Sequence, residues 1–284
     1  MEGDEAIGVS KVVNPSHDRK GVDKVPLAYA RGSDGSFCSL LWEMSSGREE
    51  DALMEKRKRQ FVNYLFYKAM PQWRHLDRTE RERGKADFAE ILQQYSRRMI
   101  LRTYSTVGTR ADTDVMLWRV CDDLETLREM TTALNSTSLA KYLTTPYSYL
   151  AMTQTLIDVD QPRHPDSEDA RLEVVPGKAK YLFVYPFVKA REWYLLSKDV
   201  RQGMVDEHFA IGHKYPSVKI NTCYSFGLDD QEFVVAFESD EPANFLGLVM
   251  ELRESEASRY TVRDTPTFTC IAMGVWEMLD ALGG

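Results

Sequence analysis

Two stretches of this sequence repeat one order of residues: GTRADTDVMLWR at residues 108–119 and GLDDQEFVVAF at residues 227–237. Each begins with a glycine and acidic residues typical of a turn, and continues as an apolar run typical of a strand. An amphipathic helix is predicted after each one, over residues 122–134 and 242–253, followed by a serine and a tyrosine. The same order returns about 118 residues later, which indicates a duplicated α+β unit. Chance similarity between two strand–helix segments is the alternative.

Each unit is predicted to run strand–helix–strand–strand–helix–strand, which is the split βαβ or ferredoxin-like order. Two antiparallel sheets, each covered by helices on one face, can pack around a shared interior. The sequence therefore predicts an α+β protein with two tandem ferredoxin-like domains whose antiparallel sheets pack together, a dimeric α+β barrel. The elements predicted in the second unit are Ala179–Val188, Ser197–Ile211, Ser217–Phe226, Glu232–Phe237, Pro242–Arg253 and Thr267–Met273.

The predicted organisation along the chain has four parts. Residues 1–55 lack a sustained period and are predicted to be a disordered or loosely packed extension. An N-terminal ferredoxin-like domain is expected over 56–157 and a C-terminal one over 179–284. Residues 158–178, rich in Pro and Asp at their start, are the predicted linker between them.

The composition excludes several classes of function. A net charge of -8 argues against a nucleic-acid partner, because that affinity depends on Lys and Arg neutralising phosphates. No apolar run approaches the roughly 20 residues that cross a bilayer. The N-terminus lacks the order of a secretory signal, and four scattered cysteines without CxxC suit a reducing cytoplasm. Without HExxH, GxSxG or a glycine-rich phosphate loop, hydrolase and nucleotide-binding functions have no support.

One strand and one helix in the second unit carry the residues best suited to chemistry. Alternation places Tyr185 and Lys189 on the same aromatic face of the strand at residues 181–189. A buried lysine there would need an anion, although a lysine that reaches water at the rim is the simpler alternative. His208 lies on the apolar face of the next helix, as a satisfied core residue or as a metal ligand. A ligand would need an acceptor for its other ring N–H, for which Glu256 is a candidate.

The chain resembles the chlorite dismutase superfamily, and within it the coproheme decarboxylases of bacterial haem synthesis, from about Phe61 to Cys270. Tyr185-Pro-Phe-Val-Lys189 resembles the Tyr-Pro-x-x-Lys strand of that family. Glu207-His208-x-x-Ile-Gly212 resembles the segment that bears the proximal iron ligand, and Trp193-Tyr194 resembles an aromatic pair between them. The resemblance implies two ferredoxin-like domains in one chain, a homopentamer, and haem in the C-terminal domain.

The resemblance also implies roles for individual residues. Tyr185 would form the radical that starts propionate decarboxylation, Lys189 would assist at the propionate, and His208 would ligate the iron. Chlorite dismutases carry a distal arginine where this chain has Ile220, so the charge that stabilises a chlorite anion is missing and chlorite dismutation is not expected. Ile220 also leaves open how peroxide is positioned. The cofactor-binding residues implied are Arg171, Tyr147 and Ser258 at propionates, Trp193, Ile220, and Glu256 behind the histidine.

The expected function is hydrogen-peroxide-dependent oxidative decarboxylation of iron–coproporphyrin III (coproheme) to haem b in haem biosynthesis, so the substrate is also the redox cofactor. Expected partners are the porphyrin, hydrogen peroxide, the other subunits of a homopentamer and an upstream ferrochelatase, in the cytoplasm. An acidic chain that binds a tetra-anionic porphyrin needs local cations, for which Lys189, Arg171, Lys214 and Lys219 are candidates.

Two alternatives remain at this stage. A haem-dependent, peroxidase-like enzyme of the same superfamily would need neither Tyr185 nor Lys189. A non-catalytic haem carrier or sensor would need only His208 and a porphyrin slot. Ile220 favours both alternatives slightly, because it weakens the distal side of the site.

Overall fold

A computed structural model gives the structure of residues 59–154 and 173–283. The predicted extension at residues 1–55, residues 158–172 of the predicted linker, and Arg171 lie outside the described residues. The cysteines within the described ranges, Cys121, Cys223 and Cys270, are buried free thiols. None of the helices in these ranges has the length and apolarity needed to cross a bilayer.

The first repeat has the predicted order of elements. Its sheet is antiparallel with the strand order β4-β1-β3-β2, as a ferredoxin-like unit requires. Its helices begin where the sequence supplies caps: Asp77 accepts a hydrogen bond from the Glu80 backbone N–H at 2.8 Å, and Asp123 accepts one from the Thr126 backbone N–H at 2.6 Å. The elements are β1 (Phe61–Ala69), η1 (Pro71–His75), α2 (Arg78–Tyr95), β2 (Ile100–Ser105), β3 (Val115–Cys121), α3 (Leu124–Asn135), η2 (Leu139–Tyr142) and β4 (Leu143–Met152).

The second repeat has the same plan with additions. Its strands pair antiparallel in the order β6-β7-β5-β9, which again is the ferredoxin-like order. The short elements α4, η4, β8 and α7 were not predicted, since each is too short to show a period. The elements are β5 (Tyr181–Lys189), α4 (Arg191–Leu195), α5 (Lys198–Gly212), β6 (Lys219–Tyr224), β7 (Phe233–Ser239), α6 (Pro242–Glu254), η4 (Glu256–Tyr260), β8 (Thr261–Arg263), β9 (Phe268–Ala272) and α7 (Val275–Asp280).

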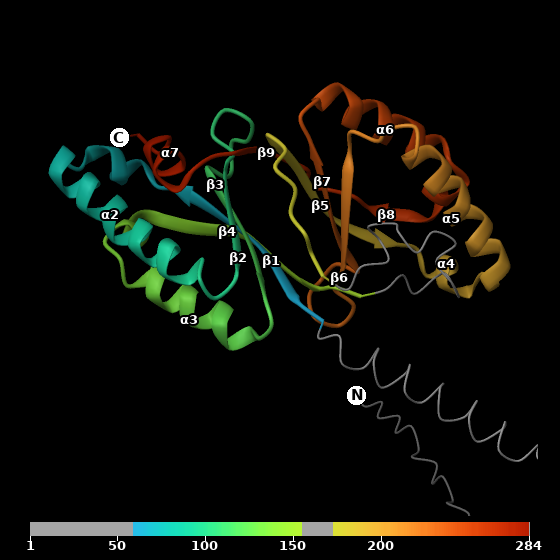
Figure 1. The fold of residues 1–284 in the computed structure, drawn as a ribbon, viewed down its shortest axis with the longest axis horizontal. Helices are drawn as coiled ribbons and strands as arrows, with labels where there is room; N and C mark the ends of the chain where they lie inside the picture. Colours follow the sequence, from blue (N-terminus) through green and yellow to red (C-terminus); the bar gives the residue numbers. More distant parts are fainter. Residues whose placement is uncertain (1–58, 155–172, 284) are drawn as a thin grey trace, which may run out of the picture. The chain divides into compact units, whose positions relative to one another are not determined.

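The two sheets share one apolar interior, as predicted. Figure 1 shows both sheets in the middle of this region, with α2 and α3 on one outer side and α5 and α6 on the other. The sheets also pair at their edges, through β2 with β9 and through a single pair, Met152 with Tyr224, between β4 and β6. Trp118 of the first repeat and Val184 and Cys270 of the second are all fully or almost fully buried in this interior.

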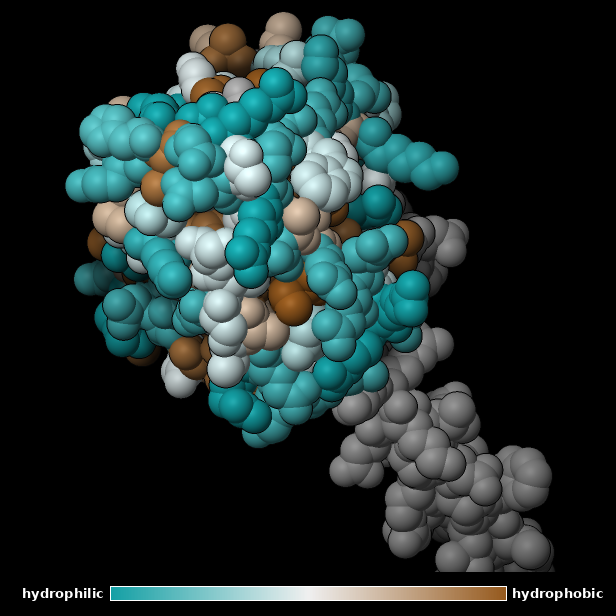
Figure 2. Space-filling view, turned by 90° about the vertical axis from the view of Figure 1, so that its left-hand side faces the viewer, coloured by the Kyte–Doolittle hydropathy of each residue, from teal (hydrophilic) through white to brown (hydrophobic). Residues whose placement is uncertain are grey.

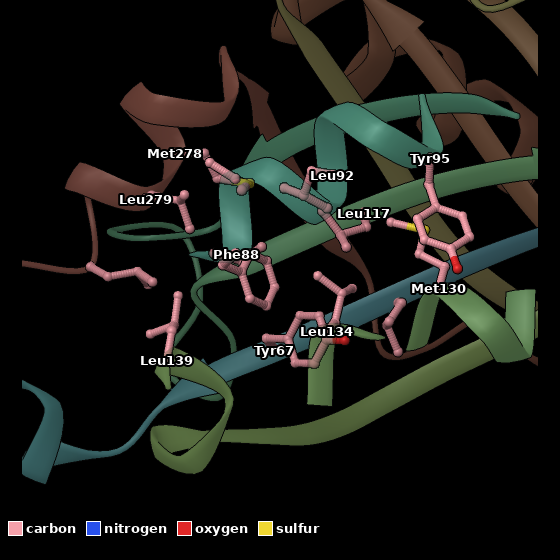
Figure 3. Packing of buried hydrophobic residues seen from close by; sticks show 14 of the residues in the cluster. Tyr67, Phe88, Leu92, Tyr95, Leu117, Met130, Leu134, Leu139, Met278 and Leu279 are labelled. Carbon is pink, nitrogen blue, oxygen red and sulfur yellow. The ribbon is translucent and has the colours of Figure 1, made fainter. Parts of the chain in front are cut away.

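Each repeat has a second core between its sheet and its own helices. In the first repeat, Phe88 and Leu92 of α2 and Met130 and Leu134 of α3 pack on the outer face of the sheet (Figure 3). Helix α7, at the end of the second repeat, contributes Met278 and Leu279 to the same core. Buried Lys85 of α2 also pairs with Asp280 of α7 at 2.8 Å. The last helix of the second repeat therefore stabilises the first.

The surface on the side of the first repeat is mostly hydrophilic, with small scattered apolar patches (Figure 2). Such a surface fits helices that bury one apolar stripe against their sheet and face water with the rest. The second repeat uses its corresponding layer differently, because its helices and sheet enclose a pocket.

Candidate functional site

A pocket lies between the outer face of β5, β6 and β7 and the helices α5, α6 and η4 of the second repeat. It holds about 1320 Å³ of empty space, part of it open to solvent. Its walls are mainly apolar and aromatic, which suits a flat, largely apolar ligand with polar groups at its edge. Of the predicted site residues, the lining includes Tyr185, Lys189, Trp193, His208, Ile220 and Ser258.

Tyr185 lies on the face of β5 that points into the pocket. Its ring stacks on Phe237 of the neighbouring strand β7, with ring centroids 5.8 Å apart. Burial raises the pKa of Tyr185 well above its ordinary value, the carboxylate of Asp264 raises it further, and Arg253 opposes the shift. The phenol is therefore protonated at neutral pH, and it can give up a hydrogen atom rather than act as a phenolate.

Lys189 ends the same face and is held in position by several contacts. Its Nζ donates a hydrogen bond to the Ala257 carbonyl at 2.9 Å and lies 4.2 Å from the centroid of the Trp193 ring. Its backbone N–H donates to Glu232 at 2.8 Å, and Tyr194 donates to the same carboxylate oxygen at 2.6 Å. The ammonium group is thus fixed at the pocket wall, where it can meet a ligand carboxylate.

His208 lies on α5 and lines the pocket from the helix side. The residue keeps exposed surface at the pocket. Partial desolvation by the surrounding protein lowers the pKa of His208 to about 4, and the Lys189 ammonium lowers it further. The ring is therefore neutral at pH 7, which is the form that binds a metal. Within the described residues, no hydrogen bond is made by its side chain.

Two predicted residues lie outside the pocket wall. Glu256, expected behind the histidine, accepts a hydrogen bond from Arg259 at 3.0 Å, and its backbone N–H donates to Glu207. No hydrogen bond joins it to His208 among the residues that the structure describes. Tyr147 is on β4 of the first repeat, where its hydroxyl donates to Asp112 at 2.7 Å.

The cations expected around the ligand are distributed differently from the prediction. Lys214 pairs with Glu251 at 2.6 Å, Lys219 donates to the Val175 carbonyl at 2.7 Å, and neither lines the pocket. Arg253 does line it, and its guanidinium pairs with Asp264 at 2.8 Å. Nothing in a single sequence distinguishes Asp264 from other surface acids. Arg253 ends a predicted helix and begins the segment Arg253-x-x-Glu256-Ala-Ser258, which resembles the family segment that supports the histidine, but the sequence gives it no role of its own at the ligand.

The donor set fits an iron porphyrin. Within residues 59–154 and 173–283, no group of three or more His, Cys, Asp or Glu side chains could hold a metal ion. One neutral histidine in an apolar pocket is, however, sufficient for a metal whose remaining equatorial ligands are porphyrin nitrogens. Lys189, Arg253 and Ser258 at the wall could contact the carboxylates at the edge of such a ring.

Comparison with known proteins agrees with this description. Residues 49–273 match the model of the family described as chlorite dismutase. A coproheme decarboxylase of Mycolicibacterium smegmatis is 32% identical over 201 residues, which cover 68% of this chain and 81% of that protein.

Two solved structures show the same fold. A mutant chlorite dismutase from Candidatus Nitrospira defluvii matches with a TM-score of 0.73 and 22% identity, over 79% of this chain and 96% of that one. A haem-binding protein from Thermus thermophilus matches with a TM-score of 0.71 and 24% identity, over 79% of this chain and 95% of that one.

Proposed function

This chain belongs to the chlorite dismutase family, and we propose that it catalyses the peroxide-dependent oxidative decarboxylation of iron–coproporphyrin III to haem b. One observation carries the proposal: Tyr185, Lys189 and His208 line a single pocket of the second repeat. A hydrogen-atom donor, a cation and a neutral imidazole are what this reaction requires from the protein. The coproheme decarboxylase of Mycolicibacterium smegmatis supports the choice of substrate.

His208 would hold the iron, and the apolar walls formed by β5, β7 and α6 would hold the ring. When bound, the iron porphyrin supplies the redox chemistry through which peroxide accepts electrons. Lys189, fixed by Ala257 and Trp193, would bind the reacting carboxylate and fix its orientation. Ser258 would contribute a hydroxyl at the same wall.

Tyr185 would transfer hydrogen. It would lose the hydrogen atom of its hydroxyl and recover one from the β-carbon of the propionate, which is the carbon bonded to the porphyrin ring; the bond between the α-carbon and the carboxylate then breaks as the vinyl double bond forms. Burial suits this role, since it keeps the phenol protonated until the reaction begins. Over one cycle a propionate and a proton give a vinyl group and carbon dioxide, while one hydrogen peroxide is reduced to two waters.

The decisive experiment is a titration of the ferric coproheme complex with hydrogen peroxide, with the porphyrins followed by mass spectrometry. We expect the loss of carbon dioxide from two propionates. Tyr185→Phe should retain coproheme and lose turnover by on the order of a hundredfold or more. Tyr181→Phe, on the same strand but outside the pocket wall, is the matched control and should keep wild-type turnover.

Each arm of this experiment has a separate meaning. If wild-type protein releases no carbon dioxide, the decarboxylase assignment is wrong. If Tyr185→Phe turns over normally, hydrogen transfer occurs at another residue. In His208→Ala the absorption spectrum of bound ferric coproheme should change. An unchanged spectrum would mean that His208 does not bind the iron and is only a core residue.

Ile220 favours a second candidate. It places an apolar side chain in the pocket wall, with no charge to position peroxide. A haem-dependent peroxidase-like enzyme, or a haem carrier, would account for such a wall. In either case the same titration would leave all four propionates intact. The homopentamer, the ferrochelatase upstream and the cytoplasmic location stay predictions from the family resemblance.

A further inference from the structure

An ion pair of the protein itself lies in the wall of the pocket. Arg253 and Asp264 both line it, and the guanidinium and carboxylate are 2.8 Å apart. The side chains keep 66% and 31% of their surface exposed, so the pair is in contact with solvent at the pocket rather than sealed in the core. Within the described residues, Asp264 is the one acidic side chain in this wall.

Both partners are held by neighbouring backbone. Arg253 is in the last turn of α6, and its carbonyl accepts a hydrogen bond from the Ser258 hydroxyl at 2.8 Å. Asp264 directly follows β8, whose Arg263 pairs with Val188 of β5. This pairing places Asp264 next to the strand that carries Tyr185, and its carboxylate raises the pKa of that phenol.

The chemistry of the pair makes a carboxylate ligand its competitor. A guanidinium forms its strongest hydrogen bonds with carboxylates, and Asp264 already supplies one. We propose that Asp264 acts as an internal competitor for the carboxylates of the ligand: it occupies Arg253 in the free protein and gives up the guanidinium when a ligand carboxylate enters. This inference rests on the proposed function, because it assumes a porphyrin with carboxylates at its edge.

Competition by Asp264 should weaken the binding of a ligand that carries carboxylates. A partly exposed ion pair contributes little stability, so a ligand carboxylate can replace Asp264 at small cost. Asp264 nevertheless leaves its negative charge in the wall and weakens the binding of every anionic edge group. Removing that charge should therefore tighten the binding of a polycarboxylate by roughly three- to tenfold. This is the size expected for the repulsion between two like charges that are separated by the width of the pocket, in a medium of intermediate dielectric constant.

The test uses metal-free coproporphyrin III, with binding followed by fluorescence and without iron or peroxide. Asp264→Asn should bind it roughly three- to tenfold more tightly than the wild type, and Asp264→Glu should stay close to the wild type. Glu129→Gln is the matched control, because Glu129 forms an exposed ion pair with Arg98 outside the pocket. The tetramethyl ester of the same porphyrin, measured in the same dilute detergent, should show no gain in Asp264→Asn.

The outcomes separate the two proposals. Unchanged or weaker binding of coproporphyrin by Asp264→Asn overturns the competition, and so does an equal gain for the ester. If Asp264→Asn does not fold, Asp264→Ser removes the same charge and is judged by the same criteria. Failure of the wild type to bind the porphyrin at all overturns the proposed function instead.

Discussion

Glu232 shows how one side chain can organise a site without lining it. Its carboxylate accepts hydrogen bonds from the Lys189 backbone and the Tyr194 hydroxyl, so it joins the end of β5 to helix α4. The adjacent Trp193 ring then lies 4.2 Å from the Lys189 ammonium. The aromatic pair that follows the Tyr-Pro-x-x-Lys strand therefore helps to hold Lys189 in position. Trp193 contacts the cation, and Tyr194 anchors the backbone that carries it.

A pH-dependent contribution to stability is expected from Asp112 in the first repeat. Arg110 donates two hydrogen bonds to its carboxylate, at 2.6 and 2.8 Å, and this lowers the pKa of Asp112 to about 2. A depressed pKa stabilises the folded state above the unfolded pKa of about 4 and loses that effect as the pH falls towards 2. Because the carboxylate is partly exposed, the contribution at pH 7 is at most about 1 kcal/mol.

Asp112→Asn should therefore lower the free energy of unfolding at pH 7, and the difference from the wild type should vanish by about pH 2. Urea denaturation at a series of pH values measures this. Asp230→Asn, at an exposed position in the equivalent turn of the second repeat, should show no such trend. A difference that grows as the pH falls would contradict the assignment.

At the scale of elements, the long periodic segments were predictable and the contacts across elements were not. Alternation along residues 181–189 correctly places Tyr185 and Lys189 on one face, because that period follows from the strand itself. Periodicity cannot say which group another element presents to that face. Asp264 belongs to an irregular segment after β8, and Glu256 turns to Arg259 within its own short helix. Neither arrangement leaves a signal in the sequence.

Helix α6 should be stabilised mainly by its buried stripe. Leu248 is fully buried, packs in the core of the second repeat and lines the pocket. Leu248→Ala should lower the free energy of unfolding by about 2–5 kcal/mol, because it removes apolar contacts and leaves a cavity. Leu246 lies on the same helix with 62% of its surface exposed, so Leu246→Ala should change stability by less than about 0.5 kcal/mol. Equal effects, measured by urea denaturation, would mean that α6 is not packed as described.

At the scale of the whole described region, duplication explains the order of strands but not the dependence of one repeat on the other. The sheets share an interior, β2 pairs with β9, and the first-repeat turn donates hydrogen bonds to the second through Thr109 and Arg110. Helix α7 crosses back to pack on α2. Because large buried side chains fill the outer core of the first repeat, that repeat can act as a rigid support for the one that holds the pocket.

These shared contacts lead us to expect that the two repeats unfold together. Trp118 is fully buried in the common interior and stacks on Tyr64. Trp118→Ala should therefore cost about 3–5 kcal/mol, and the loss should appear in both repeats. Hydrogen exchange of peptides from β1 and from β5 reports the opening free energy of the first and of the second repeat separately; amides in one cooperative unit share one opening free energy.

Trp276→Ala is the control substitution, because Trp276 lies on α7 with 52% of its surface exposed. It should leave the opening free energies of both repeats nearly unchanged. Protection lost in β1 but kept in β5 would mean that the pocket repeat is stable by itself, and that edge pairing contributes little to the site.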